Sequence, residues 1–386
     1  MAKHKPADKP YPDFPLFPHA TGQWAKKVRG KMHYFGTDRD AALKRFLEVR
    51  DDLYAGRTPR PKAGELTVAD LANHFLTRKR QQVDAGELSA RMWSDYHAAC
   101  ESAVDSLGRN RPVAGLADSD FASLRATMAK RLGPVALGVF IQRTRTVFKF
   151  GYESGLLEVP IRYGQGFDKP ARRVLRKQRS AAGPKMISAA DVWKLVEAAD
   201  SPMDAMILLG VNCGFGQADI SELPRAALAR RPGWVDFPRP KTGIGRRCPL
   251  WPETVEALKV ATLARPDATD PADNGLAFIT RFGRPWVRYV DKGSERRGTR
   301  SDAVALRFTR LVKRAGVTVP GGFYTLRHVF RTVADEARDT VAAGLIMGHD
   351  DPSMAGAYRE QVSDERLRAV TDHVRGWLLA GKPGKV

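Results

Sequence analysis

Three short stretches near the end of the chain decide its fold: YTLRH (Tyr324–His328), IMGHDD (Ile346–Asp351) and AGAYRE (Ala355–Glu360). Arg327 and His349 are 22 residues apart, and Tyr358 follows nine residues after His349. These three residue types suit chemistry on a phosphodiester. A tyrosine hydroxyl can attack phosphorus, an arginine fork can bind the non-bridging oxygens, and a histidine can donate to them or handle a proton. Taken singly, each residue also fits a structural role, as a buried arginine, a capping histidine and a core tyrosine.

A fourth stretch, WVDFPRPKTGIGRRCPLWPETVEAL (Trp234–Leu258), predicts two strands joined around Lys241-Thr242-Gly243 and followed by a helix. A lysine ammonium at such a turn can protonate the leaving oxygen of a phosphodiester. It can equally be a hairpin lysine that touches a nucleic-acid backbone, and the residues alone leave both readings open.

Taken together, these stretches resemble the second catalytic box and the lysine hairpin of the tyrosine recombinases, the phage-integrase family. The resemblance covers about residues 66–375. It implies a multidomain fold, with a mainly α-helical core-binding domain and an α+β catalytic domain. It also implies a nucleophile at Tyr358, transition-state stabilisation by Arg327 and His349, a general acid at Lys241, and no cofactor or metal.

Two positions depart from that family pattern. The family's first arginine slot falls in CGFGQADI (Cys213–Ile220) and holds Gly216, and the histidine that opens the family's His-x-x-Arg motif is replaced by Tyr324. Loss of one preorganised donor typically costs a hundred- to a thousand-fold in rate. Residues that could support the site are Gln217, Asp219 and His328, and arginines that could substitute by sequence position are Arg225, Arg246 and Arg247.

Two functions therefore remain open. The first is a site-specific recombinase or integrase that cuts and rejoins DNA through a phosphotyrosyl intermediate. The second is a catalytically impaired DNA-binding protein, a regulator or accessory factor, on the same scaffold. Gly216 and Tyr324 favour the second, whereas the four retained catalytic positions favour the first. A relative of the type IB topoisomerases fits the expected core-binding domain less well.

The charge balance indicates a polyanionic partner. The chain has 64 Lys and Arg against 43 Asp and Glu, a net charge of +21. Double-stranded DNA is the leading candidate and anionic lipid the alternative. The resemblance adds self-assembly on DNA, as a dimer to tetramer. Three widely spaced cysteines show neither metal-ligand nor disulfide spacing, and the first residues lack a signal-peptide pattern, so we expect a cytoplasmic protein without a membrane partner.

The chain divides by composition and periodicity into six parts. We expect a flexible arm (1–18), a small basic hairpin–helix module (19–64), a helical core-binding domain (66–160), a basic linker (161–185), a catalytic domain (186–375) and a tail (376–386). Helices are predicted at 38–54, 68–85, 89–106, 117–132, 135–153, 202–212, 219–223, 252–264, 301–315, 326–337, 341–347 and 364–380, with short strands in 233–249 and 276–285. The residues predicted to contact DNA are Lys26, Lys27, Arg29, Lys31, Arg143, Arg145, Arg172 and Arg173.

Overall fold

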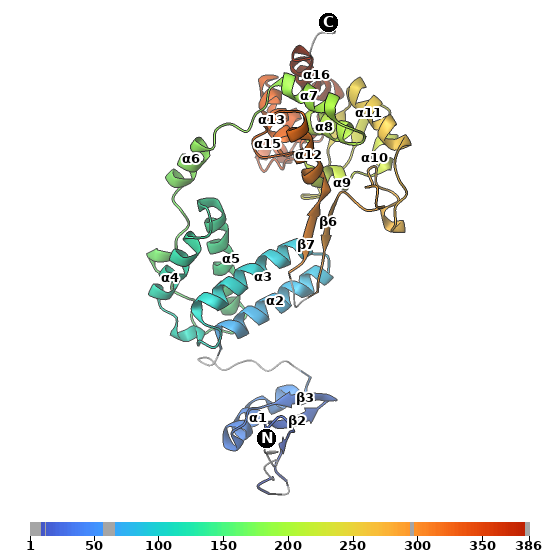
Figure 1. Ribbon diagram of the computed structural model, residues 1–386. Helices are drawn as coiled ribbons and strands as arrows, with labels where there is room; N and C mark the ends of the chain where they lie inside the picture. Colours follow the sequence, from blue (N-terminus) through green and yellow to red (C-terminus); the bar gives the residue numbers. More distant parts are fainter. Residues whose placement is uncertain (1–8, 12, 57–65, 294–296, 383–386) are drawn as a thin grey trace. The chain divides into compact units, whose positions relative to one another are not determined.

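The computed structural model describes residues 9–11, 13–56, 66–293 and 297–382, which form two compact units, Met1–Ala171 and Arg172–Val386 (Figure 1). The first eight residues of the expected arm, the last part (57–64) of the expected hairpin–helix module and the last four residues of the tail lie outside the described residues. None of the described helices is long and apolar enough to cross a membrane.

The start of the N-terminal unit is a small sheet covered by one helix. The sheet has the order β1-β2-β3, all antiparallel, and is followed by α1. The β2–β3 turn falls at Arg29-Gly30, where φ is 49° and 82°, as a tight two-residue hairpin turn requires. The elements are β1 (Phe17–Pro18), β2 (Trp24–Val28), β3 (Lys31–Tyr34) and α1 (Arg39–Tyr54).

The expectation of a flexible arm up to residue 18 is wrong at its end. Phe14 and Leu16 are buried with Trp24 and Phe46 in the core of this module, and Phe17–Pro18 pairs with β2. These apolar side chains lack helical or strand periodicity, so the burial that orders them is a tertiary effect.

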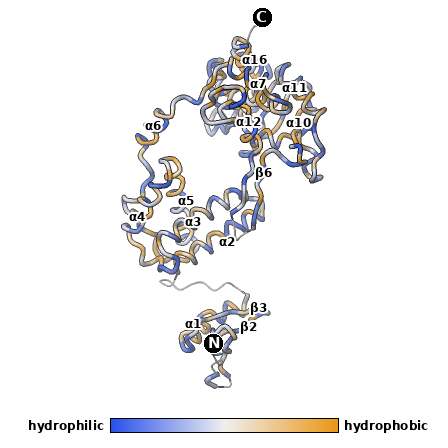
Figure 2. Tube along the Cα trace, in the orientation of Figure 1, coloured by the Kyte–Doolittle hydropathy of each residue, from blue (hydrophilic) through white to orange (hydrophobic). Residues whose placement is uncertain are grey.

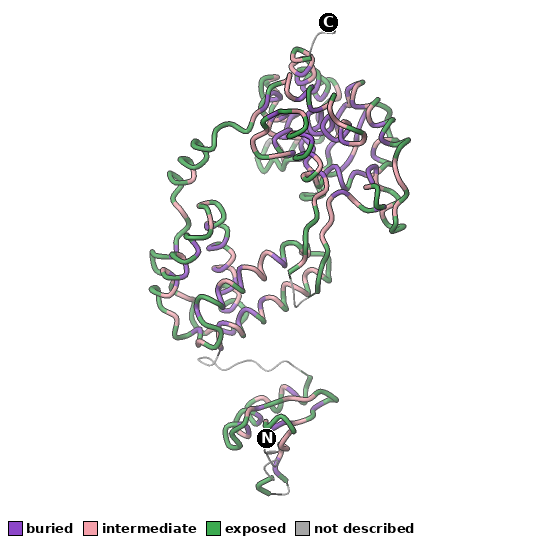
Figure 3. The backbone as a smooth tube through the Cα atoms, viewed as in Figure 1, coloured by how far each residue is buried: buried purple, intermediate pink, exposed green. Residues whose placement is uncertain are grey.

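The rest of the N-terminal unit is helical, as the periodicity predicted. Thr67 caps the first helix, and Asp70 completes a capping box with it. Apolar side chains on one face of each helix are buried, and together they form one core (Figures 2 and 3). The helices are α2 (Val68–Asp84), α3 (Ala90–Leu107), α4 (Asp118–Ala129) and α5 (Pro134–Glu153).

The segment expected to be a linker at 161–185 is partly core and partly helix. Phe167 is fully buried and packs with Tyr163 against Phe121. The helical core therefore extends beyond residue 160, because aromatic burial outweighs the Gly- and Pro-rich composition of this stretch. After it comes α6 (Arg172–Ala181), a basic helix with no buried residue.

The C-terminal unit is built around α8 (Met203–Asn212), which is buried at every position except Asp204. Helices α11, α13 and α7 contact α8, and α16 closes the core, where Val374 and Leu378 are buried. The indole Nε1 of Trp193 donates to the carbonyl of Leu378, so α16 packs on its own unit. The remaining helices are α7 (Ala189–Ala198), α9 (Gln217–Ser221), α10 (Arg225–Ala229), α11 (Pro252–Leu263), α12 (Ala303–Arg314), α13 (Thr325–Glu336), α14 (Thr340–Ile346), α15 (Met354–Ala357) and α16 (Asp364–Ala380).

Two antiparallel hairpins complete this unit. The first pairs β4 (Trp234–Asp236) with β5 (Arg247–Pro249), as predicted. The second pairs β6 (Val287–Val290) with β7 (Thr299–Asp302), which the sequence did not indicate. The strand expected at 276–285 is reduced to isolated bridges at Leu276 and Ile279.

Candidate active site

The centre of the candidate site is a contact between Arg327 and His349. Arg327 lies in the first turn of α13 and is 3% exposed. Its Nη2 donates to the Met347 carbonyl at 2.9 Å and lies 3.0 Å from Nε2 of His349, while Nη1 donates to the Gly214 carbonyl. Because a guanidinium has no acceptor, His349 must accept through Nε2, which leaves its proton on Nδ1.

The environment keeps His349 neutral. Burial lowers the pKa of His349 to about 4, and the charges of Arg327, Arg239 and Arg331 act in the same direction. A neutral imidazole that accepts from Arg327 has one remaining donor, Nδ1–H. The arrangement therefore supplies a hydrogen-bond donor, and no charge, beside the arginine.

Asp219 links the site to a second buried arginine. The backbone N–H of Gly216 donates to Asp219 Oδ2 at 2.7 Å, which ties the carboxylate to the start of α9. Arg246 Nη2 lies 2.9 Å from Oδ1 of Asp219, and Arg327 Nη1 lies 4.0 Å from Oδ2. One carboxylate thus stands between two guanidinium groups.

The Arg246 side chain is buried and fixed by several contacts. It is 3% exposed, its Nε donates to the Phe237 carbonyl at 2.9 Å, and its guanidinium lies 4.1 Å from the ring centre of Phe215. Burial lowers the pKa of Arg246, and the charge of Asp219 opposes that shift. Its Nη1 is buried without a hydrogen-bond partner in the described structure. Arg246 therefore joins the hairpin to α9 and leaves one buried donor unused.

The two departures from the family pattern touch each other. A Cβ placed on Gly216 would lie 3.2 Å from Cε2 of Tyr324 and 3.4 Å from Asp219 Oδ2. The Tyr324 ring thus lies over the point where a larger side chain at position 216 would leave the backbone. The same ring makes an edge contact with His328, at 5.5 Å between centres. Burial and the charges of Lys185, Arg179 and Arg327 lower the pKa of His328.

The β4–β5 hairpin reaches the turn that carries His349. Thr242 Oγ1 and Arg239 Nη1 each donate to the Gly348 carbonyl at 3.4 Å. Gly348 has φ 62°, and a Cβ there would lie 2.8 Å from Cβ of Arg239. Lys241 is exposed at the tip of this hairpin, next to Thr242. The hairpin therefore lies against the Gly348–His349 turn, and sequence reasoning did not identify Arg239 as part of this contact.

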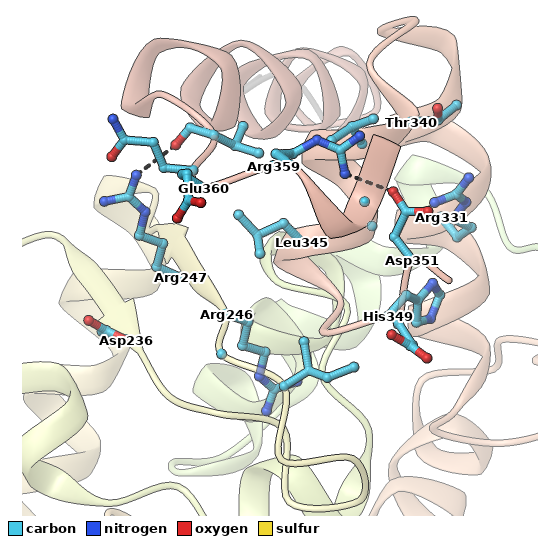
Figure 4. A pocket seen from close by; sticks show the side chains of 18 residues that line it. Asp236, Arg246, Arg247, Arg331, Thr340, Leu345, His349, Asp351, Arg359 and Glu360 are labelled. Carbon is cyan, nitrogen blue, oxygen red and sulfur yellow. Dashed lines mark hydrogen bonds and ion pairs between the residues drawn. The ribbon is translucent and has the colours of Figure 1, made fainter. Parts of the chain in front are cut away.

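A cavity of about 770 Å³ opens between the hairpin and α14 (Figure 4). Arg246, Arg247, Arg331 and His349 line it. Its far side is the segment after His349, where Arg359 pairs with Asp351 at 2.7 Å. The cavity wall carries four arginines and four carboxylates, with the neutral His349 between them, so an anion that enters it would meet guanidinium groups already balanced by acidic side chains.

Tyr358 is not among the residues that line this cavity. It follows α15 directly, and its side chain is 78% exposed. The structure thus brings together Arg327, His349 and the turn of the Lys241 hairpin, and it leaves the phenol of Tyr358 in solvent.

The arginines proposed as substitutes, and Gln217, differ in what they contact. Arg225 is exposed at the start of α10, and Arg247 pairs with Asp364 at 3.1 Å and donates to the Val362 carbonyl. Of the three arginines considered as substitutes, Arg246 is the one that reaches Asp219. Gln217 is half-buried as the first residue of α9.

The predicted DNA-contacting residues also differ from one another. Arg143 pairs with Asp95 at 2.7 Å, and Arg145 pairs with Asp168 at 2.8 Å, so each already has a carboxylate partner within its own unit. Arg29 donates weakly to the Tyr54 carbonyl, at 3.4 Å. The remaining predicted residues, Lys26, Lys27, Lys31, Arg172 and Arg173, are half-exposed or exposed on β2, β3 and α6.

The fold of the described chain is that of the tyrosine recombinases. A lambda integrase tetramer bound to a Holliday junction is similar over 92% of this chain and 98% of its own, with a TM-score of 0.53 and 16% identity. The Tn1549 transposon integrase in complex with transposon right end DNA is similar over 80% of this chain and 100% of its own, with a TM-score of 0.53 and 17% identity. No family model and no curated protein sequence matches the chain.

Proposed function

We propose that the protein is a site-specific DNA recombinase that cuts and rejoins DNA through Tyr358. The observation that carries the proposal is the hydrogen bond between Arg327 and His349, against a hairpin whose tip holds Lys241. Residues 22 positions apart meet at 3.0 Å, and one of them, His349, lines the cavity, in the fold of the tyrosine recombinases. The similar lambda integrase and Tn1549 integrase structures both hold DNA, which supports double-stranded DNA as the partner.

The proposed reaction runs through these side chains. The Tyr358 oxygen attacks phosphorus, the phenol proton passes to solvent, and the bond to the 5′ oxygen breaks. Arg327 and the Nδ1–H of His349 stabilise the charge on the non-bridging oxygens. Lys241 gives a proton to the departing 5′ oxygen. The protein is left joined to the 3′-phosphate, and the reverse sequence rejoins the strand without a cofactor.

Two further features belong to the proposal. Tyr358 must move from its exposed position to reach the phosphate, and binding of DNA supplies the free energy for that movement. Assembly on DNA as a dimer to tetramer is supported by the similar lambda integrase structures, a tetramer and a dimer. A cytoplasmic location agrees with three cysteines that are all free and buried.

The second candidate is a DNA-binding protein without strand transfer. Three observations favour it: the glycine at position 216, the tyrosine at position 324 and the exposed Tyr358. Such a protein would bind the same DNA and leave it intact.

Covalent trapping separates the two candidates. Selection from a random duplex library first defines the bound site, and a nicked version of that site then lets the cut end diffuse away. The natural protein should give a covalent protein–DNA band, and Tyr358→Phe should bind equally well and give none, because only the hydroxyl is removed. Tight binding to the selected site with no band from the natural protein would establish the non-catalytic candidate.

A further inference from the structure

Three arginine side chains lie close to one another in the candidate site, and one of them lacks an anionic partner. Arg246 lies 2.9 Å from Asp219, and Arg327 lies 4.0 Å from the same carboxylate. Arg239 differs from both: within the described part of the chain it is paired with no carboxylate, and its one side-chain hydrogen bond goes to the Gly348 carbonyl at 3.4 Å. Of these three arginines, Arg239 is therefore the one whose charge no carboxylate of the described residues balances.

The backbone fixes where Arg239 stands. Its N–H donates to the Ile244 carbonyl at 2.8 Å, and its own carbonyl accepts from the N–H groups of Thr242 and Gly243 at 3.1 and 2.8 Å. Its side chain is half-buried, so part of it remains accessible. A tight turn with three backbone hydrogen bonds thus presents Arg239 two residues before Lys241, on the same hairpin.

The side chain points into the candidate site. Its stem lies against the Gly348 turn, where an added Cβ would come within 3.1 Å of Cδ of Arg239, and Gly348 immediately precedes His349. Its charge is also among the causes that lower the pKa of Arg327 and the pKa of His349, after burial in both cases. Geometry and electrostatics agree that Arg239 faces these two residues.

Position 216 cannot hold such a cation in this chain. The glycine there has no side chain, and the Tyr324 ring would lie 3.2 Å from an added Cβ, so an arginine stem would fit only if that ring shifted. Arg246 cannot take over either, because its Nη atoms are buried and its charge is turned toward Asp219. The charge missing from α9 has to enter from another element.

We propose that Arg239 is a further catalytic residue, whose guanidinium binds a non-bridging oxygen of the scissile phosphate and supplies from the hairpin the charge absent at position 216. The proposal rests on the proposed function for its substrate. A planar guanidinium can donate two parallel hydrogen bonds to a phosphate. The Arg239 guanidinium is half-buried and pairs with no carboxylate of the described chain, so it breaks no ion pair when it binds the phosphate.

Inorganic phosphate tests the binding step without any catalysis. The ring signals of His349, identified by their loss in His349→Gln, are followed in the full chain as phosphate is added. Arg239→Gln should weaken phosphate binding about tenfold to a hundredfold, since it removes a charge-assisted hydrogen bond. Arg225→Gln is the matched control: it removes an exposed arginine of the same unit, at the start of α10, and should leave the affinity unchanged. Equal effects of the two substitutions would overturn the proposal.

Covalent trapping on the selected site tests the chemical step. Arg239→Gln should slow formation of the adduct by roughly a hundred- to a thousand-fold. Relocating the charge, with Tyr324→His and Gly216→Arg added to Arg239→Gln, should restore part of the rate. A structural role for Arg239 would not be rescued in this way, so a failure of the relocation would count against the proposal. If the natural protein forms no adduct, the proposed function fails, and the phosphate titration still decides whether Arg239 binds the anion.

Discussion

At the scale of single residues, the candidate site is defined by how few donors remain free. Arg327 uses its guanidinium on two backbone carbonyls and on His349, and His349 is left with one N–H. The sequence predicted that these two residues meet, because their spacing matches a known motif. It could not predict that His349 is neutral, since that depends on the arginines of other elements that face it.

Stability should depend on pH through His349. Its folded pKa, about 4, lies below the ordinary value of 6.5, so the unfolded chain takes up a proton that the folded chain refuses. The stabilising contribution is complete above pH 6.5 and is lost as the pH falls toward 4. Thermal unfolding of the natural protein and of His349→Gln should diverge within that window. His33→Gln, on β3 of the other unit, is the matched control; a difference for His349→Gln that stays constant from pH 7 to 4 would contradict this expectation.

The Asp219–Arg246 pair should behave as a buried ion pair. Asp219→Asn leaves a guanidinium that is 3% exposed without its charge partner, which should cost about 3–5 kcal/mol in the free energy of unfolding. The double substitution Asp219→Asn with Arg246→Met removes both charges and should recover most of that loss. Denaturant titrations of the three proteins measure both steps. A double variant no more stable than Asp219→Asn would show that packing, and not charge, sets the cost.

At the scale of elements, the periodic helices were predicted closely and the irregular segments were not. The capping box at Thr67 and the apolar faces of α2–α5 are local signals, so sequence alone was sufficient for them. The β6–β7 hairpin was missed because neither strand has a buried residue and hence neither has an alternating pattern. Phe167 was assigned to a linker because its burial depends on aromatic partners far away in the sequence.

The junction between the β4–β5 hairpin and the His349 turn should be sensitive to one methyl group. Gly348→Ala places a Cβ 2.8 Å from Cβ of Arg239 and forces alanine to adopt φ 62°, so we expect a loss of about 1–3 kcal/mol in stability and a slower adduct. Gly344→Ala, in α14 with open space around the added methyl, is the matched control and should be neutral or slightly stabilising. Thermal melts of both variants provide the measurement, and equal melting temperatures would argue that the hairpin is loosely docked.

The basic helix α6 should contribute to DNA binding through phosphates alone. Replacing Arg172, Arg173 and Arg176 by Gln should weaken binding to all duplexes alike and lower the slope of log affinity against log salt by about 0.9 for each phosphate that is no longer neutralised. Lys194→Gln with Lys259→Gln, which removes two lysines that pair with carboxylates one turn away, is the control. An unchanged salt slope in the α6 variant would show that this helix does not lie on the DNA.

At the scale of the whole molecule, a net charge of +21 distributed over both units indicates that the protein binds a long polyanion electrostatically. The fold could be inferred from motif spacing, and the composition predicts a polyanionic partner. The role of single cations could not be inferred, because sequence alone does not show that Arg143 and Arg145 each pair with a carboxylate of the same unit.

Binding of the full chain to duplex DNA should therefore depend steeply on salt. If six to ten phosphates are neutralised, affinity should fall about 10³- to 10⁵-fold between 50 and 200 mM salt. Fluorescence anisotropy with a duplex of fixed length measures this fall. A nearly flat dependence would contradict the assignment of DNA as the partner.

The contact between Gly216 and Tyr324 also constrains the order in which this site can change. An arginine introduced first at position 216 would have to push the ring of Tyr324 aside by a few tenths of an ångström, whereas a smaller side chain introduced first at position 324 would open the space. Restoring the usual pair of residues should therefore be easier when position 324 changes before position 216. Anyone who redesigns this site meets that preferred order.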